Sequence, residues 1–137
     1  MTLTPFERII LDALVAGDTA ELVVLREQVA AASATARELT GVGFFATLAI
    51  PPGSPRLAPA IGGSLSDVGA TLIGVEHGVG FVLFLKDGAL DVLEGFTYGE
   101  AWPAVPELIR WYYLRRAGGS GALLETPVVR AGPTPLG

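Results

Sequence analysis

The apolar residues in the first quarter of the chain recur at the spacing of a helix face and predict two short helices. The first begins at residues 4–7 (Thr-Pro-Phe-Glu), where the threonine caps, the proline takes the first helical position and the glutamate completes a capping box. Gly17 ends this helix, and Asp18 with Glu21 opens the second. The two apolar stripes are Phe6, Ile9, Ile10, Ala13 and Leu14, and then Leu22, Leu25, Val29 and Ala32.

From about Thr35 the pattern changes to the two-residue alternation of strands. The first alternating set is Val42, Phe44, Ala46, Leu48 and Ile50. A proline-rich stretch at 51–59 then predicts an irregular surface loop, because proline cannot continue a ladder. Three more strands are expected at 68–76, 81–86 and 89–96, and the last two are joined by Asp87-Gly88, a favoured two-residue hairpin turn.

These turns predict a register for the three strands. Lys86 faces Ala89 and, continuing the same pairing, Phe81 faces Glu94. A tight turn at Gly78-Val79 would pair Glu76 with Phe81. Both faces of this meander are then largely apolar, with Leu72, Leu83, Leu85, Leu90 and Val92 on one and Ile73, Val75, Val82, Phe84 and Leu93 on the other. Such a sheet needs cover on both sides, by helices on one and by the C-terminal segment or another subunit on the second.

The remaining residues complete the predicted fold. A connector at 98–106 leads to Leu108–Leu114, whose aromatic and β-branched residues favour a strand although the length also permits a helix. The fold class is α+β, with two N-terminal helices packed on a mostly antiparallel sheet of about five strands. We expect one domain over residues 1–116, followed by a flexible joint and an extended, proline-containing tail at 117–137.

Composition and charge exclude several classes of protein. Half of the 137 residues are hydrophobic, which argues against disorder. Nine Lys and Arg against 14 Asp and Glu give a net charge of −5, which argues against a nucleic-acid partner. No apolar stretch approaches the roughly 20 residues of a membrane-spanning helix, and Glu7, Arg8 and Asp12 interrupt any signal sequence. The sequence predicts a cytoplasmic protein without membrane association.

The predicted register groups two carboxylates that suit acid–base catalysis. Glu76 and Glu94 would lie about 10 Å apart across Phe81, at an apolar sheet end that raises a carboxyl pKa. His77, the only histidine, is a further candidate proton shuttle in the Gly78-Gly80 turn. The alternatives are that both glutamates reach solvent at the sheet rim or accept hydrogen bonds, and that His77 is a solvated turn residue.

A second candidate cluster favours binding over catalysis. Tyr98, Glu100 and Trp102 follow the third strand of the meander and, with Phe81, are typical of a recognition surface. The alternative is a connector that Trp102 pins over the end of the sheet. One histidine, no cysteine and no phosphate-binding or dinucleotide-binding context predict no metal and no cofactor.

The stretch from Gly80 to Gly88, continued by Leu93-Glu94-Gly95-Phe96-Thr97-Tyr98 and Trp102-Pro103, resembles a pattern in a group of small uncharacterised bacterial cytosolic proteins with no assigned activity. With Gly41 to Phe45 included, the resemblance spans much of the chain between the helices and the connector. It implies a self-standing α+β domain and carries over no catalytic residue.

Two classes of function follow from these patterns. The first is a non-enzymatic protein-interaction domain, an immunity or accessory factor, that contacts another protein through its acidic or aromatic surface or self-associates through the second sheet face. The alternative is a small hydrolase or isomerase in which Glu94 acts as acid or base with Glu76 or His77.

Overall fold

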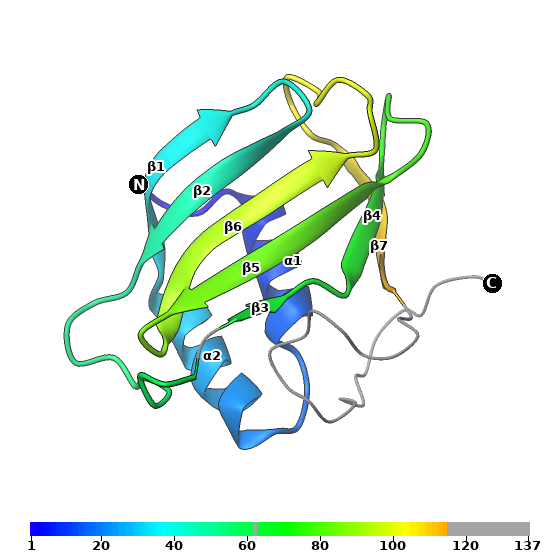
Figure 1. Cartoon of the computed structure of the whole chain (residues 1–137). Helices are drawn as coiled ribbons and strands as arrows, with labels where there is room; N and C mark the ends of the chain where they lie inside the picture. The colour runs from blue at the N-terminus through cyan, green and yellow to red at the C-terminus, as the bar shows by residue number, and fades with distance from the viewer. Residues whose placement is uncertain (62, 115–137) are drawn as a thin grey trace.

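Two helices lie against one face of a single antiparallel sheet in the computed structural model, which describes residues 1–61 and 63–114 (Figure 1). Helix α1 spans Pro5–Val15 and helix α2 spans Ala20–Ala31. The predicted α+β class and the pair of N-terminal helices are confirmed. The predicted tail at 117–137 lies outside the described residues, and neither helix in the described part is long and apolar enough to span a bilayer.

Local capping determines where both helices begin. The predicted capping box of α1 is present, since the Thr4 hydroxyl accepts from the Glu7 amide at 3.1 Å and the Glu7 carboxylate accepts from the Thr4 amide at 2.9 Å. Helix α2 begins after Thr19, whose hydroxyl accepts from the Leu22 amide at 3.2 Å. The sequence predicted that this helix would begin at Asp18, one residue too early. Thr19 is the N-cap, because its backbone is extended and its hydroxyl accepts a hydrogen bond from an amide of the first turn.

The described part of the sheet has seven strands in the order β1-β2-β6-β5-β4-β7, with β3 paired to β5 on the same side as β4. About five strands were expected. The pattern of residues 33–50 does not reveal that this segment forms two strands of a hairpin, and a strand of three residues is too short to show alternation. The final segment is a strand, as its aromatic character favoured. The strands are β1 (Ser33–Leu39), β2 (Gly43–Ala49), β3 (Gly63–Leu65), β4 (Val68–Leu72), β5 (Val79–Lys86), β6 (Ala89–Thr97) and β7 (Leu108–Tyr113).

The Asp87-Gly88 turn is formed as predicted, with φ values of 53° and 77° that match the left-handed conformation of a two-residue hairpin. Lys86 pairs with Ala89, but a bulge follows in β6 and the register changes. Beyond it Val82 pairs with Glu94, whereas the sequence predicted that Phe81 would do so. The predicted register is therefore correct only between the Asp87-Gly88 turn and the bulge. It is wrong for every pair from Phe84 back to Val79.

The predicted turn at Gly78-Val79 is also wrong. Strand β4 ends at Leu72, and a loop at 73–78 leads to β5, so that Gly69 pairs with Gly80 and Ala70 with Val79. Gly74 and Gly78 of this loop both adopt positive φ, which glycine accepts without steric cost. Glu76 therefore lies in this loop and does not pair with Phe81.

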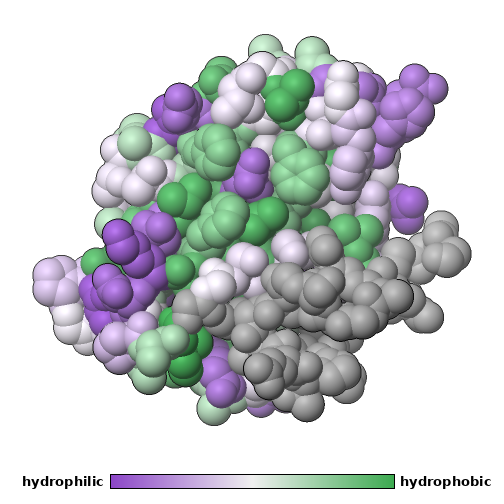
Figure 2. Space-filling model, viewed as in Figure 1, coloured by the Kyte–Doolittle hydropathy of each residue, from purple (hydrophilic) through white to green (hydrophobic). Residues whose placement is uncertain are grey.

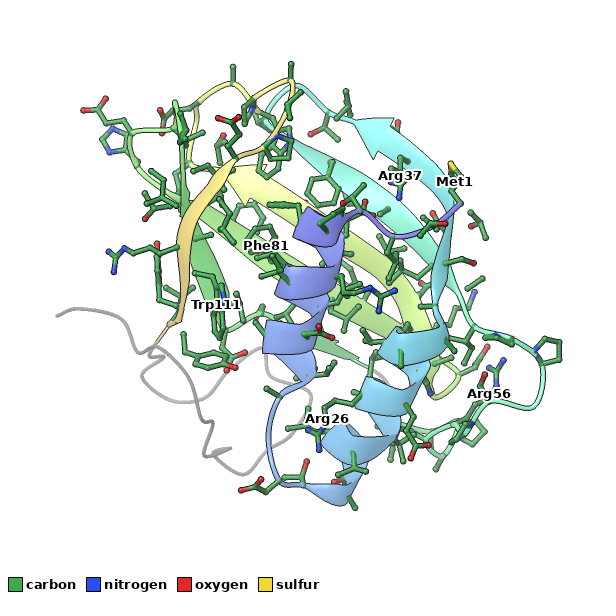
Figure 3. The ribbon with its side chains drawn as sticks, turned by 180° about the vertical axis from the view of Figure 1, so that it is seen from behind. Met1, Arg26, Arg37, Arg56, Phe81 and Trp111 are labelled. Atoms are coloured by element: carbon green, nitrogen blue, oxygen red, sulfur yellow. The ribbon has the colours of Figure 1, made fainter. Side chains whose placement is uncertain are left out.

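The hydrophobic core lies between the helices and the sheet. Helix α1 contacts β4 and β5, and α2 contacts β6. The Phe81 ring is buried on this side of the sheet (Figure 3), with its centroid 5.8 Å from that of Phe6. The Tyr113 hydroxyl donates a hydrogen bond to the Ala13 carbonyl at 2.8 Å. This hydrogen bond links β7 to α1.

One polar side chain is fully buried in this core. The side-chain amide of Gln28 donates to the carbonyls of Pro55 and Gly88 at 2.9 and 3.0 Å and accepts from the Leu90 amide at 3.0 Å. Strand β2 pairs with β6 only as far as Val92. Beyond that point the side-chain amide of Gln28 exchanges hydrogen bonds with the β6 edge, in the place that the backbone of a neighbouring strand would take. Gln28 thereby links α2 to the proline-rich loop and to the hairpin.

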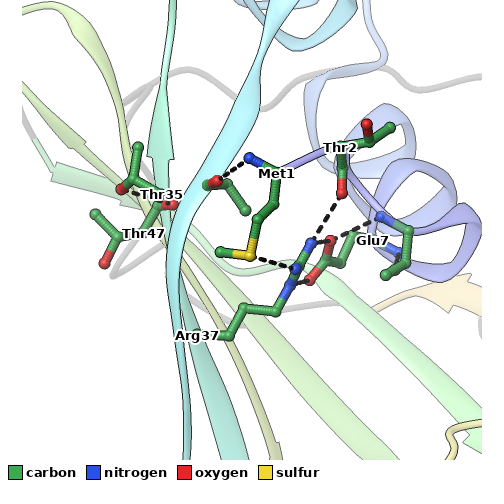
Figure 4. A network of polar contacts seen from close by, with 8 residues as sticks. Met1, Thr2, Glu7, Thr35, Arg37 and Thr47 are labelled. Carbon is green, nitrogen blue, oxygen red and sulfur yellow. Dashed lines mark hydrogen bonds and ion pairs between the residues drawn. The ribbon is translucent and has the colours of Figure 1, made fainter.

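Arg37 on β1 forms hydrogen bonds with residues at the start of α1 (Figure 4). Its guanidinium donates to the two carboxylate oxygens of Glu7 at 2.7 and 2.8 Å and to the Thr2 carbonyl at 3.1 Å. Burial raises the pKa of Glu7, but the hydrogen bonds and charge of Arg37, together with the hydrogen bonds from Thr4, outweigh burial and leave this pKa below its ordinary value.

Replacing Arg37 with Met should lower the free energy of unfolding at pH 7 by about 1–2 kcal/mol, because the mostly buried Glu7 carboxylate loses its charged partner. A depressed folded-state pKa stabilises the fold fully above the unfolded carboxyl pKa of about 4.3, and this contribution is lost as pH falls through the folded value. The deficit of Arg37→Met, measured by urea unfolding, should therefore shrink between pH 7 and pH 3. Arg56→Met, in the exposed loop, is the control, and a deficit independent of pH would contradict this account.

Candidate functional site

The bulge in β6 determines which side chains occupy the open face of the sheet, which we define as the face opposite the two helices. Residues paired across an antiparallel ladder share a face, so Glu94 lies with Val82 on the open face while Phe81 points toward the helices. Leu90 and Leu93 are both buried although they are three residues apart, which a regular strand does not permit. The extra residue of the bulge lets both leucines reach the core, and it turns Glu94 outward.

Apolar side chains surround Glu94 on this face. Phe45 of β2 and Val82 of β5 are its cross-strand partners, and Val92 and Phe96 are its neighbours two positions away along β6. All five residues are partly exposed, and we refer to them together as the Glu94 patch. Figure 2 shows hydrophobic side chains gathered on this face with hydrophilic ones between them.

Further aromatic residues extend the patch on both sides. Phe84 pairs with Val92 and is 37% exposed. On the other side the Phe96 ring covers Gly80, where an added Cβ would lie 2.6 Å from the ring, and Tyr98 packs edge-on against Phe96 at 5.7 Å between centroids. Tyr98 is itself 57% exposed. The open face thus presents a continuous aromatic and aliphatic surface with one carboxylate at its centre.

In the described part of the chain, the charged side chains of the open face form no ion pair. Among residues 1–61 and 63–114, no salt bridge or hydrogen bond reaches the Glu94 carboxylate. Glu38 of β1 pairs with Phe45 and so adds a second carboxylate to the same row. At the far edge, the Arg110 guanidinium lies 5.2 Å from the centroid of the Tyr112 ring. This surface therefore already holds one cation against an aromatic face.

Glu76 and His77 lie together in the 73–78 loop, away from Glu94. Their side chains are 82% and 65% exposed, and the closest carboxylate oxygen is 3.9 Å from the histidine Nε2. The Glu100 carboxylate accepts hydrogen bonds from the backbone amides of Glu76 and His77, both at 2.8 Å. Thr97 in turn accepts from the Glu100 amide at 3.1 Å and donates to the Glu100 carbonyl. Glu100 therefore orders this loop.

These two amide hydrogen bonds, first that of Glu76 and then that of His77, lower the pKa of Glu100. The loop contacts should be complete above the ordinary carboxyl pKa and lost as pH falls through the lowered value. We expect the amide chemical shifts of Glu76 and His77 to report this acid transition, and Glu100→Gln to abolish it while the thermal midpoint changes little. Glu107→Gln is the control, and a transition that persisted in Glu100→Gln would contradict this assignment.

Two of the predicted binding residues belong to an aromatic cluster on the helix side. Phe81 is 1% exposed, and Trp102 is partly buried with its ring 5.2 Å from Phe44 and 6.3 Å from Phe6. The Trp102 amide also donates to the Gly41 carbonyl at 2.9 Å. This is the geometry of the alternative considered for Trp102, in which it pins the connector over the end of the sheet.

The sequence reasoning missed Phe45 and Phe96 as surface residues. The signal that would have revealed them is the spacing of Leu90 and Leu93, because burying both requires a bulge and reverses the faces beyond it. Once the faces are reversed, Glu94 and Phe96 move together to the open face, and the β2 pairing adds Phe45.

The described residues form no group of three histidine, aspartate or glutamate side chains that could hold a metal ion. The side chains described on the open face are mainly aromatic and aliphatic, with the Glu94 carboxylate among them. No protein-family model, curated protein or solved structure matches the chain.

Proposed function

We propose that this chain is a protein-interaction domain that binds its partner through the open face, centred on the Glu94 patch. The observation that carries the proposal is that the two helices cover one face of the sheet, whereas no described helix or strand covers the other. The exposed face carries the aromatic side chains of Phe45, Phe84, Phe96 and Tyr98, and aromatic residues are enriched at protein interfaces.

The geometry gives less support to the acid–base alternative, because the predicted pairing of Glu76 and Glu94 with Phe81 is not formed. This alternative required Glu94 close to Glu76 or His77, but these two lie in the 73–78 loop and Glu94 lies within the β6 ladder among apolar side chains. An immunity or accessory role, self-association and a cytoplasmic location stay predictions, and each is compatible with an interaction domain.

Site-specific photo-crosslinking in the native host tests the proposal. A benzoylphenylalanine at position 84 should crosslink to one dominant protein, because this side chain lies on the proposed contact surface. The same probe at position 23, which is 41% exposed on α2, is the matched control and should give no such product. Equal crosslinking from both positions, or none from position 84, would contradict the proposal.

The identity of the crosslinked product separates two kinds of partner. A covalent dimer of this chain, supported by light scattering of the purified protein, would identify self-association through the open face. A product with another protein would identify a heterologous partner, and its binding to the purified chain should then be weakened by Phe84→Ser and unaffected by Val23→Ser.

A further inference from the structure

We infer that the partner presents an arginine side chain to the Glu94 patch, where the guanidinium pairs with the carboxylate and stacks against the flanking aromatic rings. This inference rests on the proposed function and names the chemistry of its partner.

The position of Glu94 creates the requirement for a cation. Phe45, Val82, Val92 and Phe96 surround the carboxylate on all four sides of the ladder. A partner that covers these apolar side chains therefore also removes Glu94 from water. Burying an ionised carboxylate without a partner costs several kcal/mol, and no described residue of this chain pairs with it. Since no described residue of this chain supplies the compensating charge, we assign it to the bound partner.

The surroundings of the carboxylate favour arginine over lysine. A guanidinium is planar, donates two parallel hydrogen bonds to one carboxylate and stacks on aromatic faces, whereas an ammonium is compact and strongly hydrated. Phe45 and Phe96 flank Glu94 on two sides and offer such rings. The contact of Arg110 with Tyr112 at 5.2 Å shows this pairing on the same face.

The wider charge distribution supports the same choice. Glu38 extends the acidic row beyond Phe45, and the whole chain carries a net charge of −5. The described cations of the open face, Lys86 and Arg110, lie on the hairpin end of β5 and on the outer strand β7. The centre of the face is thus negative, and it complements a basic residue flanked by apolar ones.

The test uses two soluble peptides and the full chain. The first is acetyl-Val-Arg-Val-amide, and the second replaces its arginine with norleucine, which keeps the aliphatic stem and removes the charge. Binding is followed by the amide chemical shifts of the Glu94 patch during titration. We expect the arginine peptide to bind about tenfold more tightly than the norleucine peptide. Glu94→Gln should remove this difference, and Glu27→Gln on α2 should preserve it.

Each other result overturns the inference. Equal affinity for the two peptides, a preference that survives Glu94→Gln, or no shift at millimolar arginine peptide would show that the patch does not recognise a guanidinium. Equal affinity with shifts confined to the patch would overturn the arginine requirement while the open face remained an interaction surface. Failure of crosslinking from position 84 would instead remove the proposed function.

Discussion

Replacing Gln28 with Met is expected to lower the free energy of unfolding by about 2–4 kcal/mol, because it leaves the buried Leu90 amide without a partner, at about 1–3 kcal/mol, and removes two further hydrogen bonds to backbone carbonyls. Gln28 is fully buried and contacts the carbonyls of Pro55 and Gly88 and the amide of Leu90. Gly88 keeps its hydrogen bond from the Leu57 amide, and Pro55 is exposed to water, so the Leu90 amide carries most of the cost. Urea unfolding at pH 7 measures the effect.

Two further variants separate the amide contacts from general effects of substitution. Glu27→Met, on the exposed side of the same helix, should change stability by less than about 0.5 kcal/mol. Gln28→Glu places a carboxyl against two carbonyls, so its charged form is disfavoured and its stability should increase as pH falls. A Gln28→Met protein as stable as the wild type would show that water or a shifted backbone replaces these hydrogen bonds.

Gly43→Ala is the second substitution with a large expected effect, a loss of about 3 kcal/mol. A Cβ at Gly43 would lie 2.0 Å from the Gly95 carbonyl oxygen, which belongs to the adjacent strand β6. Backbone in the interior of a sheet cannot move aside as a flexible side chain does, so β2 and β6 must separate at this end. Thermal and urea unfolding should both report the loss.

Gly41→Ala is the matched control for this substitution. Gly41 lies in the turn that precedes β2 and has φ of 89°, but an added Cβ would meet nothing within 4 Å. Its cost should be limited to the backbone term of about 1 kcal/mol. If both variants lost the same stability, the close approach between Gly43 and Gly95 would not be present in solution.

Local signals in the sequence predict the local structure well. The capping box at Thr4, the turn at Asp87-Gly88 and the strand at 108–113 depend on residues close together in the chain, and all are present. The alternation of apolar and polar residues along the chain does not predict the bulge in β6. Leu90, Val92 and Leu93 are all apolar, so the choice of which two face the core is made by the helices packed there.

The candidate site, like the fold, could be predicted from the sequence only in part. Glu94 and Tyr98 were singled out by residue type, and both lie on the open face. Their neighbours could not be predicted, because a shift of one residue moves every later side chain to the opposite face. The role of Glu100 was similarly hidden, since its hydrogen bonds reach a loop 23 and 24 residues away.

The position of Glu94 on the open face is the claim on which both the proposed surface and its arginine partner depend. Cross-strand nuclear Overhauser effects between β5 and β6 test it in the intact protein. We expect backbone proton contacts that join Glu94 to Val82 and Leu93 to Leu83, with further contacts between Glu94 and Phe45. Contacts that joined Glu94 to Phe81 and Val92 to Leu83 would place the carboxylate on the helix side and contradict the account.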